Sequence, residues 1–327
     1  MNSIPPRYLD FATAFEPGSF RTLALLIGGI FTFATVVIAA LHLAGKLKPE
    51  KSRELKLRMW SWAAIILIFM VPISAGQVPV MVAMTALSLF CFNEYARAVG
   101  LFREKTMYAI CAVGILLVNL AAADRWYNFF NALSILTCVV LSGLGIWKDQ
   151  PKGYTQRVGL AVFGFMFFGY GLAHVSYLAN DPNFRGIITF LILSTELNDV
   201  FAYVTGHLFG RKKLAPNTSP GKTIAGSIGA LILTTALAGC VGPLIFAGTQ
   251  MANVWLCLPL GLIISTSGQL GDLMLSSVKR DIGVKDLGSV IPGHGGFLDR
   301  FDSLVLVAPA AFHFINYFNG IFPQGMN

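Results

Sequence analysis

A short acidic segment stands directly before an apolar run near the end of the chain. It reads HGGFLDRFD, from His294 to Asp302, and SLVLVAPAAFHFINYF follows it. If a helix begins near Phe297, Asp299 and Asp302 share one face of its first turn, because side chains three residues apart are neighbours on a helix. Two carboxylates so placed suit Mg²⁺, which proteins usually hold through one or two carboxylates, water and phosphate oxygens. Helix capping is the plainer alternative for both aspartates.

The loop that contains this segment is rich in glycine and positive charge. Gly293, Gly295 and Gly296 precede the expected helix, where free backbone N–H groups let an anion approach closely. The basic side chains of the loop can neutralise phosphates; they are Lys279, Arg280, Lys285 and Arg300. The sequence therefore predicts a phosphate site beside a metal site, in which His294 either takes part in the chemistry or forms a loop hydrogen bond.

Three further acidic residues lie within apolar runs, where a carboxylate is costly and usually functional. Asp272, in SGQLGDLMLSS, is expected near the end of its helix as a third metal ligand facing Asp299, or as a polar contact between helices. Glu196 and Asp199, in STELNDVFAY, are three residues apart and stand beside Asn198. They form either a polar site or structural hydrogen bonds.

A second loop, GRKKLAPNTSPGKTIAGSIGA, contains the tripeptide GKT. It is not a nucleotide-binding P-loop, because that pattern needs a glycine where Pro216 stands. Ser219, Lys222 and Thr223 can still grip a phosphate through two hydroxyls, an ammonium group and the N-terminus of the next helix. An ordinary helix start is the alternative.

Membrane helices must position these residues. Of the 327 residues, 55% are hydrophobic and only 12% are charged, against roughly 25% charged residues in a soluble domain, and the mean hydropathy is +0.67. A spanning helix needs about 20 mainly apolar residues, which predicts an all-α, polytopic fold with about ten transmembrane helices (nine or ten). They are expected near 22–45, 58–76, 78–99, 107–123, 128–147, 157–178, 186–208, 223–247, 253–275 and 303–322.

The basic residues predict the orientation of these helices. All but four of the 24 Lys and Arg lie in or beside the connections on one side; the exceptions are Arg7, Arg21, Arg125 and Arg185. By the positive-inside rule that side is cytoplasmic. The net charge of +8 therefore reflects topology, and no nucleic acid partner is expected.

The position of the candidate site residues, between Glu196 and Asp302, divides the chain by expected role. Residues 1–185 are expected as generic transmembrane helices, and 186–327 as the catalytic region. The cytoplasmic loops of that region are expected at 209–222 and 276–302, where most of the charge gathers. We therefore expect a multi-pass protein of the cell (inner) membrane whose active site lies at the cytoplasmic face.

Taken together, these positions resemble the signature of the CDP-diacylglycerol synthases, also called phosphatidate cytidylyltransferases. The residues that carry the resemblance are Ser276, Lys279, Arg280, Lys285, Asp286, Pro292, His294, Gly295, Gly296, Asp299, Arg300 and Asp302. The likeness extends upstream through Gly271-Asp272-Leu273, Ser219-Pro220, Lys222-Thr223 and Gly226 to Asn198-Asp199 and Ala202-Tyr203. Three positions depart from the usual pattern, namely Gly221, where a lysine is common, and Ala225 and Leu275, where a glutamate is usual.

The resemblance implies a polytopic enzyme that joins CTP to phosphatidic acid, releasing pyrophosphate and forming CDP-diacylglycerol for phospholipid biosynthesis. Family members need Mg²⁺, and their two metal-binding aspartates match Asp272 and Asp299, to which we add Asp302. Catalytic roles are expected for Asp272, Lys279, Lys285, Asp286, His294 and Asp299. Substrate binding is expected for Asp199, Ser219, Lys222, Thr223, Arg280, Gly295, Gly296 and Arg300. The expected partners are CTP, phosphatidic acid and membrane lipids, and the family's known homodimers add a second copy of the chain.

Two other functions fit parts of the sequence. A cytidylyltransferase acting on another lipid phosphate, such as an isoprenoid or an ether lipid, would need the same site. An ion-coupled transporter would use Glu196, Asp199 and Asp272 as proton or cation sites. Such a transporter would concentrate its charges near the membrane midplane, whereas here they gather in two loops.

Overall fold

The computed structural model describes residues 9–16, 18–44, 49–146, 149–288 and 296–320, and it is mainly helical. In chain order its elements are α1 (Ser19–Leu43), α2 (Pro49–Ala75), α3 (Gln77–Ala98), η1 (Leu101–Arg103), α4 (Lys105–Ala123), α5 (Tyr127–Ile146), α6 (Tyr154–Gly164), η2 (Phe165–Gly171), α7 (Leu172–Leu178), α8 (Phe184–Phe209), β1 (Lys213–Ala215), β2 (Ser219–Thr223), α9 (Ile224–Ile245), α10 (Val254–Asp281), α11 (Leu298–Phe301) and α12 (Leu304–Asn319).

The predicted all-α, polytopic fold is confirmed. Among the described residues, 8 helices are long and apolar enough to cross a membrane, and two shorter apolar helices cover Trp62–Ala75 and Leu304–Asn319. Each of the ten predicted segments coincides with a helix or, for 157–178, with the continuous run α6, η2 and α7, in which η2 is a π-helix. The predicted end of one helix near residue 275 is wrong, because α10 continues to Asp281 and carries Ser276 and Lys279 into the site described below.

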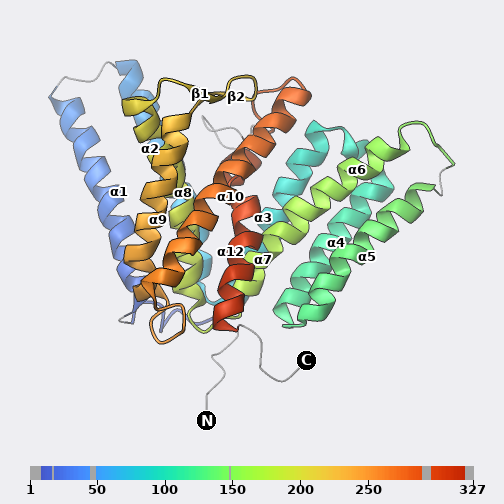
Figure 1. Ribbon diagram of the computed structural model, residues 1–327, viewed down its shortest axis with the longest axis horizontal. Helices are drawn as coiled ribbons and strands as arrows, with labels where there is room; N and C mark the ends of the chain where they lie inside the picture. The colour runs from blue at the N-terminus through green and yellow to red at the C-terminus, as the bar shows by residue number, and fades with distance from the viewer. Residues whose placement is uncertain (1–8, 17, 45–48, 147–148, 289–295, 321–327) are drawn as a thin grey trace, which may run out of the picture.

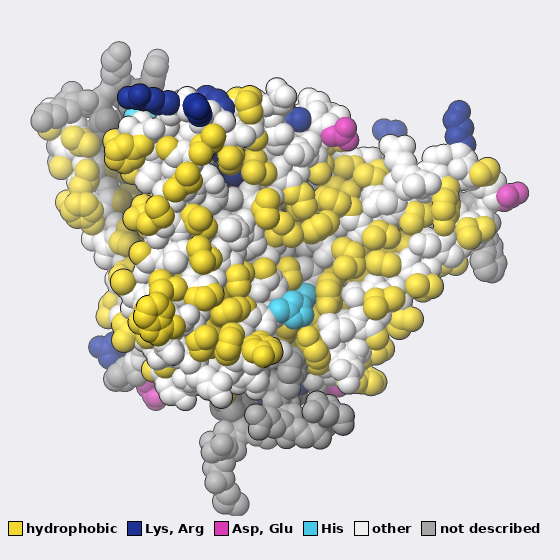
Figure 2. All heavy atoms as spheres, in the orientation of Figure 1, with side chains coloured by type: hydrophobic (Ala, Val, Ile, Leu, Met, Phe, Trp, Pro, Cys, Tyr) yellow, Lys and Arg dark blue, Asp and Glu magenta, His cyan; other side chains and the backbone are white. Residues whose placement is uncertain are grey.

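The helices run between two edges of the molecule (Figure 1). The hairpin of β1 and β2, the end of α10 and the start of α6 lie at the upper edge, and α1 begins and α12 ends at the lower edge. Lys and Arg gather along the upper edge of the face in Figure 2, while hydrophobic side chains cover much of the height below it. This distribution fits an integral membrane protein, and the assignment of the upper edge to the cytoplasm stays a prediction.

Close packing and hydrogen bonds join α8, α9 and α10. A Cβ atom on Gly226 of α9 would lie 2.5 Å from the carbonyl oxygen of Ala202 on α8, so only glycine allows this approach. The Asn198 side-chain oxygen on α8 accepts hydrogen bonds from Thr234 Oγ1 on α9, at 3.1 Å, and from Ser265 Oγ on α10, at 2.6 Å. Small residues and interhelical hydrogen bonds are the usual means of association in a bilayer, where lipid tails remove the hydrophobic driving force.

The predicted loop 209–222 contains an antiparallel hairpin that the sequence did not reveal. Its two short strands, β1 and β2, are joined by a turn that includes Pro216 and Asn217, residue types that favour turns. The Thr223 side chain at the end of β2 accepts a hydrogen bond from the Gly226 N–H at 3.1 Å and so caps α9. The hairpin therefore places the GKT residues at the upper end of α8, α9 and α10.

Candidate active site

A polar cavity of about 680 Å³ lies where the hairpin meets α8, α9, α10 and α11. The predicted site residues that line it are Asp199, Ser219, Lys222, Thr223, Asp272, Lys279, Asp286, Asp299, Arg300 and Asp302. Residues that are more than a hundred positions apart in the chain, such as Asp199 and Asp302, thus share one cavity. The structure brings together both loops and the acidic residues that the sequence singled out separately.

An ion pair joins the hairpin to α10 across this cavity. Lys222 Nζ lies 2.5 Å from Asp272 Oδ2, and both side chains are about one-fifth exposed. The other oxygen of Asp272 accepts a hydrogen bond from Ser276 Oγ at 3.1 Å, one helical turn further along α10. Asp272 is therefore held at the cavity wall by a cation that comes from the GKT segment.

A second ion pair joins α10 to the short helix α11. Lys279 Nζ lies 3.0 Å from Asp299 Oδ1, and the Asp299 side chain is only 4% exposed. Asp299 Oδ2 accepts hydrogen bonds from the backbone N–H groups of Leu287 and Gly296, each at 3.0 Å. The Gly296 N–H, which the sequence assigned to a phosphate, is thus taken up by a carboxylate in this state.

Asp302 is a further carboxylate that lines the cavity. It is buried, its Oδ1 accepts a hydrogen bond from the Ser303 N–H at 2.8 Å, and the Ser303 hydroxyl donates to Asp199 at 3.3 Å. Burial raises the pKa of the Asp302 carboxyl well above its ordinary value, and the nearby carboxylates of Asp272 and Asp199 act in the same direction. Carboxylates this close repel one another when they are ionised, and a bound cation would reduce that repulsion.

The carboxylates fit a hydrated metal ion that shares its coordination with a ligand. Among the described residues, no three His, Cys, Asp or Glu side chains converge to hold a metal on their own. Mg²⁺ does not need such a cage, because it is commonly bound by one or two carboxylates and completes its shell with water and substrate phosphates. Asp272 and Asp302 can supply those carboxylates. In the structure Asp272 and Asp299 each pair with a lysine, and Asp299 also accepts hydrogen bonds from two backbone N–H groups.

Glu94 of α3 is a site residue that the sequence analysis missed. The residue is 7% exposed, and its carboxylate accepts hydrogen bonds from the backbone N–H groups of Phe297, at 3.1 Å, and Leu298, at 2.8 Å. A Cβ atom on Gly288 would lie 2.5 Å from Glu94 Oε1, so glycine lets the carboxylate reach this backbone. Glu94 therefore fixes the start of α11, which carries Asp299, from a helix that was expected to be generic.

Several predicted residues lie elsewhere. Arg280 is exposed and its Nε donates to the Thr218 carbonyl oxygen of the hairpin at 3.2 Å, so it holds the hairpin and does not line the cavity. Lys285 is also exposed and away from the cavity lining. His294 and Gly295 lie outside the described residues, and their roles stay predictions.

The two acidic residues of STELNDVFAY separate into different environments. Asp199 lines the polar cavity, whereas Glu196, one turn earlier on α8, lines an apolar cavity between α1, α2 and α8. Asn198 joins the hydrogen bonds between α8, α9 and α10. Asn198 thus forms structural hydrogen bonds, whereas Asp199 is part of the polar site.

The departures from the family pattern have local explanations. Gly221 lines the polar cavity, and a Cβ atom there would meet nothing within 4 Å, so the position has room for the usual lysine. Leu275 is fully buried in the hydrophobic core, where a glutamate would be unpaired. Ala225 is half-buried in the first turn of α9, and nothing in the structure explains the missing glutamate.

The chain is similar to known proteins over most of its length. A model of the cytidylyltransferase family matches residues 56–318. The chain is 32% identical over 293 residues to the uncharacterized protein YnbB of Escherichia coli, covering 87% of this chain and 96% of that protein. It is 32% identical over 263 residues to a phosphatidate cytidylyltransferase of Staphylococcus aureus, covering 78% and 96%, and 36% identical over 211 residues to that of Staphylococcus saprophyticus, covering 61% and 75%.

Proposed function

The chain belongs to the cytidylyltransferase family, and from that premise we propose that it is a phosphatidate cytidylyltransferase. Membership makes it a membrane-bound nucleotidyltransferase of the CDP-diacylglycerol synthase type, whose substrates are CTP and a lipid phosphate. The proposal goes further in naming phosphatidic acid as that lipid and CDP-diacylglycerol and pyrophosphate as the products.

The observation that carries this proposal is the polar cavity at the end of the membrane helices. Lys222 and Lys279 each extend into it beside a carboxylate, at 2.5 Å from Asp272 and 3.0 Å from Asp299. A nucleoside triphosphate bound with a divalent cation needs both signs of charge within a few ångströms. A cavity at the edge of the apolar band also lets a water-soluble nucleotide meet a lipid whose tails stay in the bilayer.

The reaction needs no activated side chain, because the nucleophile is an oxygen of the lipid phosphate. That oxygen forms a bond to the α-phosphorus of CTP, the bond from this phosphorus to the β-phosphate oxygen breaks, and pyrophosphate leaves. Lys222, Lys279 and Arg300 neutralise the phosphate groups and hold them in line, so catalysis rests on alignment and charge stabilisation.

The metal that we propose is Mg²⁺, which Asp272 and Asp302 would hold together with Asp299, the aspartate that is paired with Lys279 in the structure. The ion would offset charge that develops on the phosphate oxygens. Asp199 lies beside these carboxylates and accepts a hydrogen bond from the Ser303 hydroxyl. As an anion it cannot neutralise phosphate charge, so we assign it the role of orienting Ser303 and the metal ligands. We further propose that the site faces the cytoplasm of the cell (inner) membrane and that the chain forms a homodimer.

The test is a direct assay of the purified protein with labelled CTP and phosphatidic acid, with and without Mg²⁺. We expect CDP-diacylglycerol only when Mg²⁺ is present, and loss of product in Asp299→Asn with normal membrane insertion. Asp124→Asn, a matched change at an exposed position after α4, should keep full activity. Wild-type activity in Asp299→Asn would refute the assigned role of that aspartate, and no product from any lipid phosphate would refute the proposed reaction.

Another lipid phosphate is the second candidate substrate, because one relative in the comparison has no assigned activity. Competition separates the two: if an isoprenoid or ether-lipid phosphate displaces phosphatidic acid at lower concentration, that lipid is the substrate. The transporter interpretation is set aside by family membership.

A further inference from the structure

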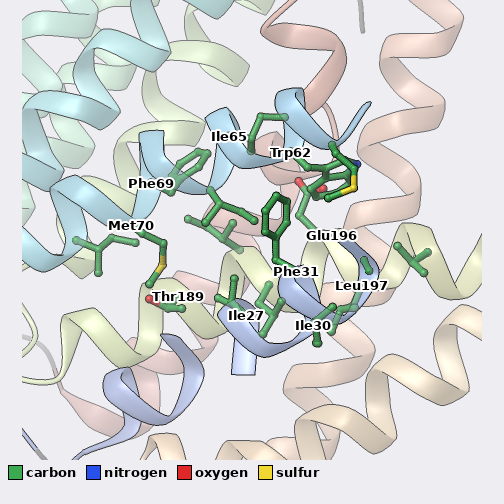
Figure 3. A pocket seen from close by; sticks show the side chains of 17 residues that line it. Ile27, Ile30, Phe31, Trp62, Ile65, Phe69, Met70, Thr189, Glu196 and Leu197 are labelled. Carbon is green, nitrogen blue, oxygen red and sulfur yellow. The ribbon is translucent and has the colours of Figure 1, made fainter. Parts of the chain in front are cut away.

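A second cavity, apolar and elongated, lies between α1, α2 and α8 (Figure 3). Its volume is about 360 Å³, and apolar side chains of all three helices line it, among them Ile27, Phe31, Trp62, Ile65, Phe69 and Leu197. Among the lining residues, Thr189 supplies the one hydroxyl and Glu196 the one carboxyl. We call this cavity the α1/α2/α8 slot.

The slot has the length of a lipid tail. Its lining on α2 extends from Met59 to Ile73, which is roughly 21 Å of helix at a rise of 1.5 Å per residue. One leaflet of the hydrocarbon core is about 15 Å thick, half of the roughly 30 Å of the bilayer core. A single acyl chain can therefore lie along the slot.

The slot and the polar cavity meet at one turn of α8. Glu196 lines the slot and Asp199 lines the polar cavity, and residues three apart are neighbours on a helix. Arg300, which lines the polar cavity, is near enough to Glu196 for the two side chains to interact electrostatically. In Figure 3, Glu196 lies beside Trp62 at one end of the slot, and Thr189 and Met70 lie toward the other. An amphipathic ligand can thus have its phosphate in one cavity and its tail in the other.

The position of the slot favours a substrate tail as its occupant over a helix of a second copy of the chain. The apolar lining of the slot leads to the residues of the polar cavity through one turn of α8, and the headgroup of a lipid phosphate would enter that cavity. A helix of a second copy would bring no phosphate to the polar cavity. A lipid without a phosphate headgroup would likewise gain nothing from the charged groups of that cavity.

We infer that the α1/α2/α8 slot holds an acyl chain of the lipid phosphate substrate, whose phosphate reaches the polar cavity past Glu196 and Arg300. This inference rests on the proposed function. It gives α1 a role in selecting the lipid, although α1 precedes the residues 56–318 that match the family model.

Substitution within the slot tests this inference through chain-length selectivity. Ile27→Trp adds bulk inside the slot, whereas Leu25→Trp adds the same group to a side chain that is 66% exposed on the outer face of α1. For Ile27→Trp we expect the ratio of kcat/KM for dioleoyl to dioctanoyl phosphatidic acid to fall at least tenfold. The ratio for Leu25→Trp should equal that of the wild type. Equal ratios in both variants would overturn the inference while leaving the proposed reaction intact.

Photo-crosslinking of the unaltered protein provides a test that does not depend on folding of a variant. The probe is phosphatidic acid with a diazirine at the end of one acyl chain, and the labelled peptides are identified by mass spectrometry. We expect label on slot peptides of α2 and α8 that unlabelled phosphatidic acid removes and phosphatidylcholine does not. Label spread evenly over lipid-facing helices such as α5 would overturn the inference. Failure of the proposed function would differ from both results, since no lipid phosphate would then yield product in the assay above.

Discussion

Replacing Glu94 by glutamine tests whether α3 positions the catalytic segment. The Glu94 carboxylate accepts the N–H groups of Phe297 and Leu298 at 3.1 and 2.8 Å. Glutamine keeps one acceptor oxygen, so one of the two hydrogen bonds is lost and an NH₂ group faces a backbone N–H. A hydrogen bond to a charged group contributes about 1.5–3 kcal/mol. We expect the substitution to remove that much of the free energy that holds the start of α11 in place.

The loss should appear in catalysis, because the two N–H groups begin the helix that carries Asp299. At 1.36 kcal/mol for each tenfold change, the expected fall in kcat/KM is roughly 10- to 150-fold. The assay is CDP-diacylglycerol formation at varied CTP, with the midpoint of thermal unfolding measured in the same detergent. Glu16→Gln, at an exposed position before α1, is the matched control.

Two outcomes would refute the reasoning on Glu94. Wild-type kcat/KM in Glu94→Gln would show that the start of α11 does not depend on the carboxylate. A lower unfolding midpoint with unchanged kcat and KM would show that Glu94 stabilises the fold and has no part in positioning Asp299.

Three further predictions concern the hairpin, the helix contact beside it and the N-terminal segment. Lys222→Met should lower kcat about 10²- to 10³-fold, the usual cost of removing a group that stabilises developing charge, and should leave Asp272 without its cation; a kcat within twofold of the wild type would contradict this role. Gly226→Ala should destabilise the protein by about 1–3 kcal/mol through overpacking, while Gly221→Ala, which meets nothing within 4 Å, should leave the unfolding midpoint unchanged; equal midpoints would argue against the close contact of α8 and α9. Hydrogen bonds from a neighbouring threonine, with help from a nearby arginine, hold the pKa of Asp10 below its ordinary value, so the stability that it contributes is complete above pH ~4 and falls as the pH drops further; Asp10→Asn should reduce this pH dependence, and an unchanged pH profile of the unfolding midpoint would contradict it.

Hydropathy predicted the helices well because the membrane leaves few alternatives. A segment that spans a bilayer must satisfy its backbone internally and stay apolar for about 20 residues, so α8 could be placed despite Glu196 and Asp199. The end of α10 was misplaced because its last turns leave the apolar region and carry polar residues toward the cavity. The hairpin was missed because two strands of three and five residues give no periodic signal.

The candidate site was predictable as a set of residues but not as a set of pairs. The motifs identified Lys222, Asp272, Lys279 and Asp299, yet which lysine meets which aspartate depends on how the hairpin folds over α10 and where α11 begins. Glu94 had a usable signal, because it is a carboxylate within the predicted transmembrane segment 78–99, and the rule applied to Asp272 applies to it equally. It was missed because no motif surrounds it.

The lysine–aspartate pairs of the polar cavity also have a consequence for how a nucleotide and a divalent cation would bind. A nucleotide that arrives alone would draw Lys222 toward its phosphates and leave Asp272 uncompensated, and a divalent cation that arrives alone would displace the ammonium group without giving it a new partner. Leaving one member of a partly buried pair unpaired is costly, so each ligand by itself should bind weakly. A metal–nucleotide complex would exchange both partners at once, so we expect the two ligands to bind cooperatively and free CTP to bind more weakly than its metal complex.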